Sequence, residues 1–222
     1  MVALFVLVTI IALLAIEMVV GKLEGRRFNV AAPARAGLIL SEAPPEGTFF
    51  HRGHAWARVG DDGLVTAGVD SFARAMTGEP DEVSLPEIGA NLSQGAQGWL
   101  LRRGDHEIPM LSPVDGEVVA VNEETVRFPA AVAADPYNNG WLVKVRPSKL
   151  RANLANLLEG NLARRWMQES YERLNQFFSP ELGVVMQDGG SLADGIIDSI
   201  EPERLPEALR EFFLVEPDTV NQ

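Results

Sequence analysis

The sequence predicts a mainly β domain that lies between an N-terminal transmembrane helix and a C-terminal α-helical appendage. Residues 1–21 are an almost continuous apolar run. Residues 49–147 contain short runs of β-forming residues separated by turn residues, a pattern typical of a barrel or sandwich. Residues 148–222 instead repeat apolar residues at helical spacing. Residues 22–48 are rich in Ala, Pro and Gly, which predicts a linker.

The composition excludes several classes of function. The chain of 222 residues has 31 acidic and 19 basic residues, which gives a formal net charge of −12. A general nucleic-acid-binding protein needs a basic face to displace counterions, so no nucleic acid is expected as a partner. The chain also contains no cysteine. Disulfides, thiolate zinc sites and cysteine nucleophiles are therefore excluded.

The N-terminal apolar run is long enough to span a membrane. As a helix, residues 2–20 extend about 28 Å, close to the thickness of the hydrocarbon core. A secretory signal peptide is the alternative, but such a peptide normally has a basic start and a shorter apolar core. Lys22, Arg26 and Arg27 follow the run. The positive-inside rule then predicts a single pass through the inner, cytoplasmic membrane, with the C-terminal domain in the cytoplasm.

The central region begins with a hairpin signal. Residues 55–59 and 64–69 read as strands on either side of the turn at residues 60–63, and residues 71–76 read as one or two helical turns. Further strands are expected at residues 82–85, 98–102, 108–111, 116–121 and 140–145. Many short strands with Gly and Pro between them predict a small β barrel or sandwich.

The C-terminal region predicts two amphipathic helices. Apolar residues recur at helical spacing over residues 150–178, with Ser148 as the N-cap and Pro180 beyond the end, which predicts one helix of about 28 residues. A second helix is expected to begin near Pro202, a residue favoured in the first helical turn. Its apolar face comprises Leu205, Ala208, Leu209, Phe212 and Phe213.

Several short motifs in the central region occur in an order that resembles the glycine-cleavage H protein family. The motifs are His54-Ala55-Trp56, the run at residues 67–73, the run at residues 78–86, Ser112-Pro113-Val114-Asp115-Gly116-Glu117-Val118, Asp135-Pro136-Tyr137 and Gly140-Trp141-Leu142. The resemblance covers residues 54–147. It implies a lipoyl-type barrel-sandwich fold, in which the family carries lipoate on one lysine at a hairpin tip.

This lysine is missing at the matching position. The family's acceptor lies about seven residues before the Ser-Pro-Val motif, and Asp105 occupies that place. No shift in register supplies a replacement, because the chain has no lysine between Lys22 and Lys144. A carboxylate cannot form the amide that tethers lipoate, so we expect no lipoate and no other cofactor. Arg102 also stands where the family has an acidic residue next to the acceptor.

Other residues offer little for catalysis or metal binding. His106 and Glu107 are neighbours at the hairpin tip, but no nucleophile or second base is close in sequence. His51 and His54 are two imidazoles without a third nearby ligand, which is a poor metal site. The run Asp188-Gly189-Gly190 lacks the lysine and the context of a phosphate-binding loop. We therefore predict neither catalytic nor metal-binding residues, and no enzyme activity.

Two functional hypotheses follow. The first is a non-catalytic, membrane-anchored accessory or scaffold subunit of a membrane-associated complex, with a protein partner of unspecified identity. The alternative is a carrier related to the H protein, in glycine decarboxylation or a lipoate pathway. For the first hypothesis, the partner-binding candidates are Trp166, Tyr171 and Phe177, if this apolar stripe stays exposed. The stripe can instead fold back on the β domain or on the second helix.

Overall fold

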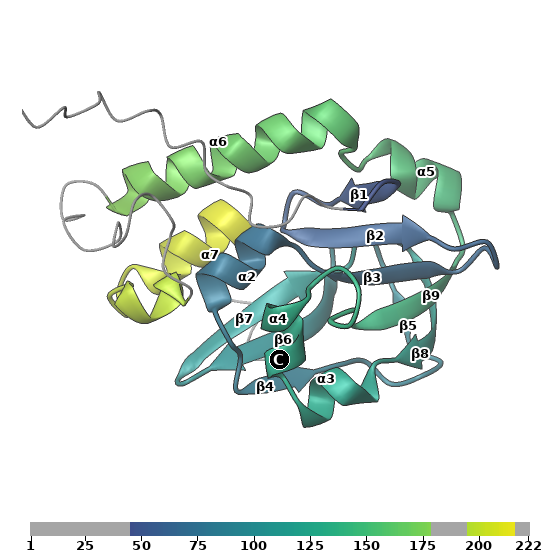
Figure 1. The fold of residues 1–222 in the computed structure, drawn as a ribbon, viewed down its shortest axis with the longest axis horizontal. Helices are drawn as coiled ribbons and strands as arrows, with labels where there is room; N and C mark the ends of the chain where they lie inside the picture. Colours follow the sequence, from purple (N-terminus) through teal and green to yellow (C-terminus); the bar gives the residue numbers. More distant parts are fainter. Residues whose placement is uncertain (1–44, 179–194, 216–222) are drawn as a thin grey trace, which may run out of the picture. The chain divides into compact units, whose positions relative to one another are not determined.

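The computed structural model describes residues 45–178 and 195–215 (Figure 1). The transmembrane helix expected at residues 1–21 and most of the linker expected at residues 22–48 lie outside this part, as does the run at residues 188–190. In the two described segments, no helix is both long enough and apolar enough to cross a bilayer.

Two antiparallel sheets form the β domain, and the expected mainly β fold is confirmed. The larger sheet contains, in spatial order, β1 (Thr48–Phe50), β2 (Ala55–Val59), β3 (Val65–Val69), β9 (Val143–Pro147), β8 (Gly116–Val121) and β5 (Asn91–Leu92). The smaller sheet contains β4 (Glu82–Ser84), β6 (Gln97–Arg103) and β7 (His106–Leu111). Strands β1 and β5 were not expected, because two or three residues are too short to show a strand period.

The β2–β3 hairpin lies inside the larger sheet, between β1 and β9, and β2 is covered on both faces. Ala55, Trp56 and Ala57 are all fully buried, so β2 does not alternate between an apolar and a polar face. The Trp56 indole packs against Gly68 of β3, since a Cβ added to Gly68 would lie only 2.9 Å from its Nε1. The same Nε1 donates a hydrogen bond of 3.0 Å to the carbonyl of Pro136. Trp56 therefore joins the sheet to the Asp-Pro-Tyr segment.

Short helices occupy the connections between strands. Helix α2 (Ser71–Thr77) is capped by Asp70, whose Oδ1 accepts hydrogen bonds from the backbone N–H groups of Phe72 and Ala73 at 3.0 and 2.9 Å. Helices α3 (Glu123–Arg127) and α4 (Ala130–Ala134) were not expected from the sequence. Each has five residues, which is too few for a helical period to be recognised.

The prediction of a single helix over residues 150–178 is wrong. The structure has two helices in this region, α5 (Leu150–Ala155) and α6 (Gly160–Phe178). At the break, the backbone of Leu158 pairs with Phe50 of β1 through two hydrogen bonds of 2.8 and 2.9 Å. This bridge takes the backbone out of the helical conformation. Gly160 then has a φ of +55°, which an L-residue rarely adopts.

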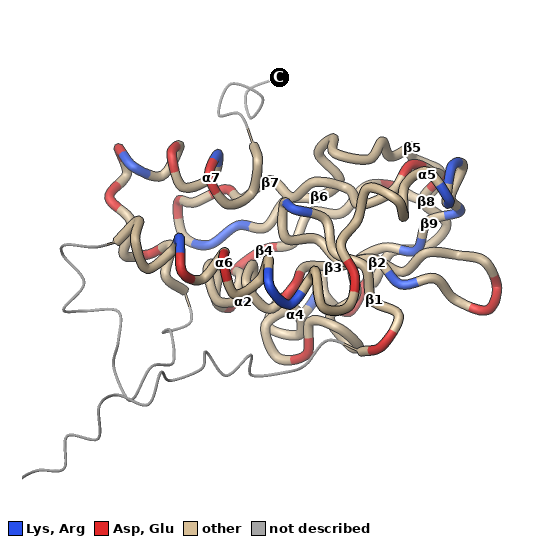
Figure 2. Tube along the Cα trace, turned by 90° about the horizontal axis from the view of Figure 1, so that it is seen from above, with Lys and Arg blue, Asp and Glu red and all other residues tan. Residues whose placement is uncertain are grey.

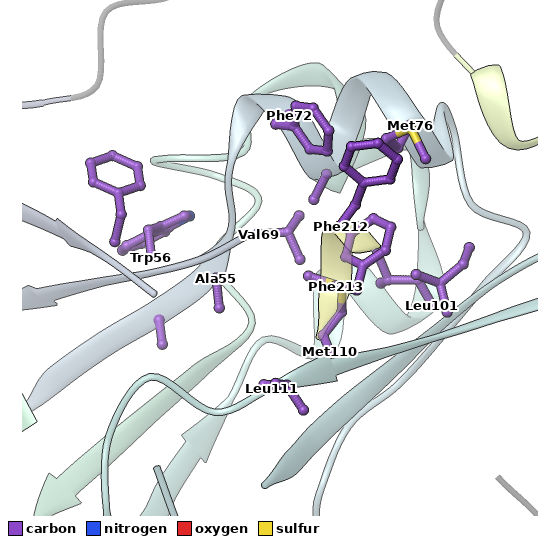
Figure 3. Close-up of a cluster of buried hydrophobic side chains, with 14 of the residues drawn as sticks. Ala55, Trp56, Val69, Phe72, Met76, Leu101, Met110, Leu111, Phe212 and Phe213 are labelled. Carbon is purple, nitrogen blue, oxygen red and sulfur yellow. The ribbon is translucent and has the colours of Figure 1, made fainter. Parts of the chain in front are cut away.

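The second C-terminal helix, α7 (Leu205–Phe213), begins after the expected position near Pro202. Pro206 is the proline in its first turn, and a short 3-10 helix, η1 (Ile196–Ser199), precedes it. Figure 1 shows α6 passing β1, α2 and α7. Figure 3 shows Phe212 and Phe213 of α7 among core residues of the β domain, so the helices share one hydrophobic core with the sheets.

Candidate functional site: the β6–β7 hairpin

The hairpin expected around Asp105 is present. Strands β6 and β7 pair up to Arg103 and His106, which leaves Gly104 and Asp105 as a two-residue loop. Gly104, the first loop residue, has a φ of +55° and Asp105 does not have a positive φ, which is the pattern of a type II′ turn. The Asp105 side chain is exposed at the tip. A residue at this position is therefore presented to solvent on a regular hairpin.

Arg103 attaches the hairpin to two other segments. Its Nε donates a hydrogen bond of 2.7 Å to Oδ2 of Asp198 in η1, and its Nη1 donates one of 2.7 Å to the carbonyl of Glu79. The backbone N–H of Gly104 donates to Oδ2 of Asp81 at 2.6 Å. The loop between α2 and β4 and the segment before α7 therefore both hold the tip.

The Arg103 guanidinium lies against two glycines. A Cβ added to Gly78 would lie 2.7 Å from its Nη1, and a Cβ added to Gly195 would lie 2.9 Å from its Nη2. Both glycines also have positive φ, +64° and +83°. An open hollow of about 410 Å³ adjoins the tip, lined by Glu79, Pro80, Asp81, Arg103, Gly104 and Asp198. Among the described residues, no three His, Asp or Glu side chains are placed to hold a metal ion.

The two arginines beside the tip are paired with carboxylates. Arg102 forms an ion pair with Glu82 across the β4–β6 pair, and Arg103 pairs with Asp198. The positive charge of these two arginines beside the tip is therefore largely balanced by the neighbouring carboxylates. Figure 2 shows acidic and basic residues interspersed over the described chain rather than gathered on one basic face.

His54 and Asp70 form a buried pair away from the hairpin tip. His54 Nδ1 lies 2.9 Å from Asp70 Oδ2, and both side chains are almost completely inaccessible to solvent. The imidazole is stacked on Phe72 and Trp166, with ring centroids 3.9 and 4.6 Å away. No substrate reaches this pair. Since Asp70 also caps α2, the pair connects the start of α2 to α6.

The two histidines do not form a common metal site. The Nδ1 of His51 accepts a hydrogen bond of 3.1 Å from the N–H of Gly53, whereas the Nδ1 of His54 faces Asp70. Burial, and secondarily the nearby His54, lower the pKa of His51 below its usual value. His54 itself has a φ of +61°, so the turn at residues 51–54 is sharp.

The three partner-binding candidates on α6 lie inside the protein. Trp166 and Tyr171 are 8% and 6% exposed, and Phe177 is half-buried. Of the two alternatives, the one in which this stripe stays exposed is wrong, because aromatic side chains of the β domain and of α7 cover it. The contacts are Trp166 with His54 at 4.6 Å, Tyr171 with Phe72 at 5.0 Å and Phe177 with Phe212 at 5.7 Å. The alternative, in which the helix folds back on the β domain and the second helix, describes the structure.

Comparison with known proteins identifies the family. The family model described as Glycine cleavage H-protein matches residues 48–170, from β1 into α6. The chain belongs to the glycine cleavage H-protein family. It is 39% identical to the Glycine cleavage system H protein of Saccharophagus degradans over 97 residues, which are 44% of this chain and 75% of that protein. It is 32% identical to the Probable glycine cleavage system H protein of Thermococcus gammatolerans over 123 residues, 55% of this chain and 91% of that one.

A solved structure also matches this member of the H-protein family. The crystal structure of a glycine cleavage system H protein from Mycobacterium marinum is 27% identical, with a TM-score of 0.49, and the match covers 57% of this chain and 98% of that chain. The family match ends at residue 170, so η1 and α7 lie beyond it. Asp198 and the two phenylalanines of α7 therefore lie outside the region that the family model matches. Family membership supports the H-protein-related alternative more directly than the accessory-subunit hypothesis.

Proposed function

We propose that this member of the H-protein family carries no lipoate and acts as a non-catalytic accessory subunit, anchored to a membrane by residues 1–21. The observation that carries the proposal is Asp105 at the exposed tip of the β6–β7 hairpin, the position that the family resemblance assigns to the lipoyl lysine. A carboxylate has no amine with which to form the amide. The hairpin is kept, whereas the group needed for attachment is absent from it.

Neither of the described lysines substitutes for the missing acceptor. Lys144 lies within β9, with its ammonium group 5.3 Å from the centre of the Trp141 ring. Lys149 precedes α5, with its Nζ 3.9 Å from a carboxylate oxygen of Asp115. Neither residue is at a hairpin tip. The carrier function, which family membership favours, would require a different attachment residue in this chain.

The experiment that separates the two functions is a mass measurement. The full chain is produced in cells with an active lipoylation system and added lipoate, beside the Saccharophagus degradans relative as the positive control. The proposal predicts that the relative gains the lipoyl mass and this chain does not. A lipoyl mass increment on this chain would sink the proposal and favour the carrier function.

The membrane anchor is tested separately. It is motivated by the apolar run at residues 2–20 and by the basic residues that follow it. Alkaline carbonate extraction should leave the protein in the membrane fraction, and a reporter fused after Gln222 should report a cytoplasmic location. Release into the soluble fraction, or a mature N-terminus near Gly21, would indicate a signal peptide instead.

A further inference from the structure

An apolar hollow lies beside β1 and the first turns of α6. Its volume is about 360 Å³, at the lower end of the range for ligand pockets. Glu46, Glu159 and Arg164 line it and are exposed, which places them at its rim. Buried side chains form its inner wall, namely Phe50, Tyr137, Ala163 and Met167. The hollow therefore has an apolar interior and a charged opening.

The described chain begins at the wall of this hollow. Pro45, Glu46, Gly47 and Thr48 all line it. The hydroxyl of Thr48 donates a hydrogen bond of 2.6 Å to the carbonyl of Pro45, which fixes this stretch. The residues immediately before Pro45 in the sequence must therefore start from the edge of the hollow.

An apolar segment of the expected linker is close enough to reach the hollow. The sequence Gly37-Leu38-Ile39-Leu40 contains three consecutive aliphatic residues and no charge. Leu40 is five positions before Pro45, which gives a reach of about 17 Å in an extended chain. Pro44 and Pro45 favour an extended approach, since proline restricts both itself and the residue before it.

We infer that Leu38 and Leu40 occupy this hollow. Side chains of an extended segment alternate in direction, so Leu38 and Leu40 share one side while Ile39 faces the other. In the hollow, the two aliphatic side chains leave water and pack against Phe50 and Met167. The charged rim suits Ser41 and Glu42, the polar residues that follow the segment. The occupant is thus part of the same chain rather than a separate ligand.

The docked segment shortens the free linker. Residues 38–44 no longer extend freely, which reduces the greatest distance between the domain and the preceding residues by about 25 Å. This consequence rests on the proposed membrane anchor, because only an anchored chain converts linker length into a distance from the bilayer. The docking itself depends neither on the anchor nor on the absence of lipoate.

Cysteine cross-linking of the full-length protein tests the inference. The chain has no cysteine, so an introduced pair reports without background. The test pair is Leu40→Cys with Met167→Cys. The matched control is Leu40→Cys with Leu162→Cys, since Leu162 is on the same helix but is 61% exposed. Disulfide formation under mild oxidation, in detergent, is followed by mass spectrometry, because the bond requires Cα atoms within about 7 Å.

The expected result is that the test pair forms its disulfide at least tenfold faster than the control. A third pair, Ile39→Cys with Met167→Cys, should be slower than the test pair, because Ile39 faces away. Equal rates for the test and control pairs, or a faster Ile39 pair, would overturn the inference and leave the hollow to an external apolar ligand. If Met167→Cys impairs folding, Ala163→Cys replaces it in every pair, and the same comparisons decide.

Discussion

Replacement of Trp166 by alanine is the perturbation that best separates a core role for α6 from an exposed binding surface. The indole is 8% exposed and is stacked on His54 at 4.6 Å, with Phe50 6.5 Å away. A tryptophan of this kind removes about 200 Å² from water. At about 25 cal/mol for each Å², this burial is worth about 5 kcal/mol.

The expected destabilisation is about 3–5 kcal/mol, because alanine retains the Cβ and the cavity collapses in part. A domain of this size has a free energy of unfolding of about 5–15 kcal/mol, so Trp166→Ala should fold but unfold at much lower denaturant concentration. Urea titration followed by far-ultraviolet circular dichroism measures the change. Leu162→Ala on the same helix is the control, and its effect should stay within about 0.5 kcal/mol.

A contrary result is easy to recognise. If Trp166→Ala lowers the free energy of unfolding by less than about 1 kcal/mol and also releases a co-purifying protein, the α6 stripe is an exposed interaction surface. The burial of Trp166 against His54 would then not describe the protein in solution. A large loss of stability, with little change from Leu162→Ala, supports the structure.

Three further predictions test other parts of the fold. Asp198→Asn should lower the free energy of unfolding by about 0.5–1 kcal/mol, and by less at high salt, because its ion pair with Arg103 is partly exposed. Urea titrations at two salt concentrations measure this change, and no loss at low salt would contradict a stabilising role for the pair. Tyr137→Phe should lower the free energy of unfolding by about 1–3 kcal/mol, because the buried N–H of Ser71 loses the Tyr137 hydroxyl that accepts from it at 3.0 Å. An unchanged thermal unfolding curve would contradict this role of Tyr137. Because the pKa of His51 is lowered in the folded state, the unfolded state binds more protons around and below about pH 6.5. The free energy of unfolding therefore decreases as the pH is lowered through this range. His51→Asn should flatten the fall in melting temperature between pH 7.5 and 5.5, and an unchanged fall would exclude His51 as its source.

Local patterns predicted the elements that local interactions determine. The strand at residues 116–121 and the short helix after Asp70 are found where the sequence indicates them, because strand propensity and an N-cap are properties of a few adjacent residues. The two-residue turn at Gly104 and Asp105 follows from turn chemistry in the same way.

Long-range contacts were not predictable in this manner. The break before α6 results from pairing between Leu158 and Phe50, which no helical period reveals. The tie between Arg103 and Asp198 joins residues far apart in sequence, and nothing near either residue signals it. The sequence left open whether the stripe around Trp166 stays exposed, because a stripe on one helix does not show what will cover it, whereas the structure buries Trp166. In each case the tertiary structure, rather than the local sequence, decides the outcome.

The most direct test of the central claim compares the natural chain with Asp105→Lys in the same lipoylating cells. The tip is exposed, the hairpin is regular, and the neighbouring arginines are paired, so a lysine at residue 105 should be accessible to the modifying enzyme. Intact-mass analysis should show one lipoyl group on Asp105→Lys and none on the natural chain. A lipoyl group on the natural chain would contradict the claim that it lacks an acceptor. A folded but unmodified Asp105→Lys would contradict the expectation that a lysine at this tip is accessible to the modifying enzyme.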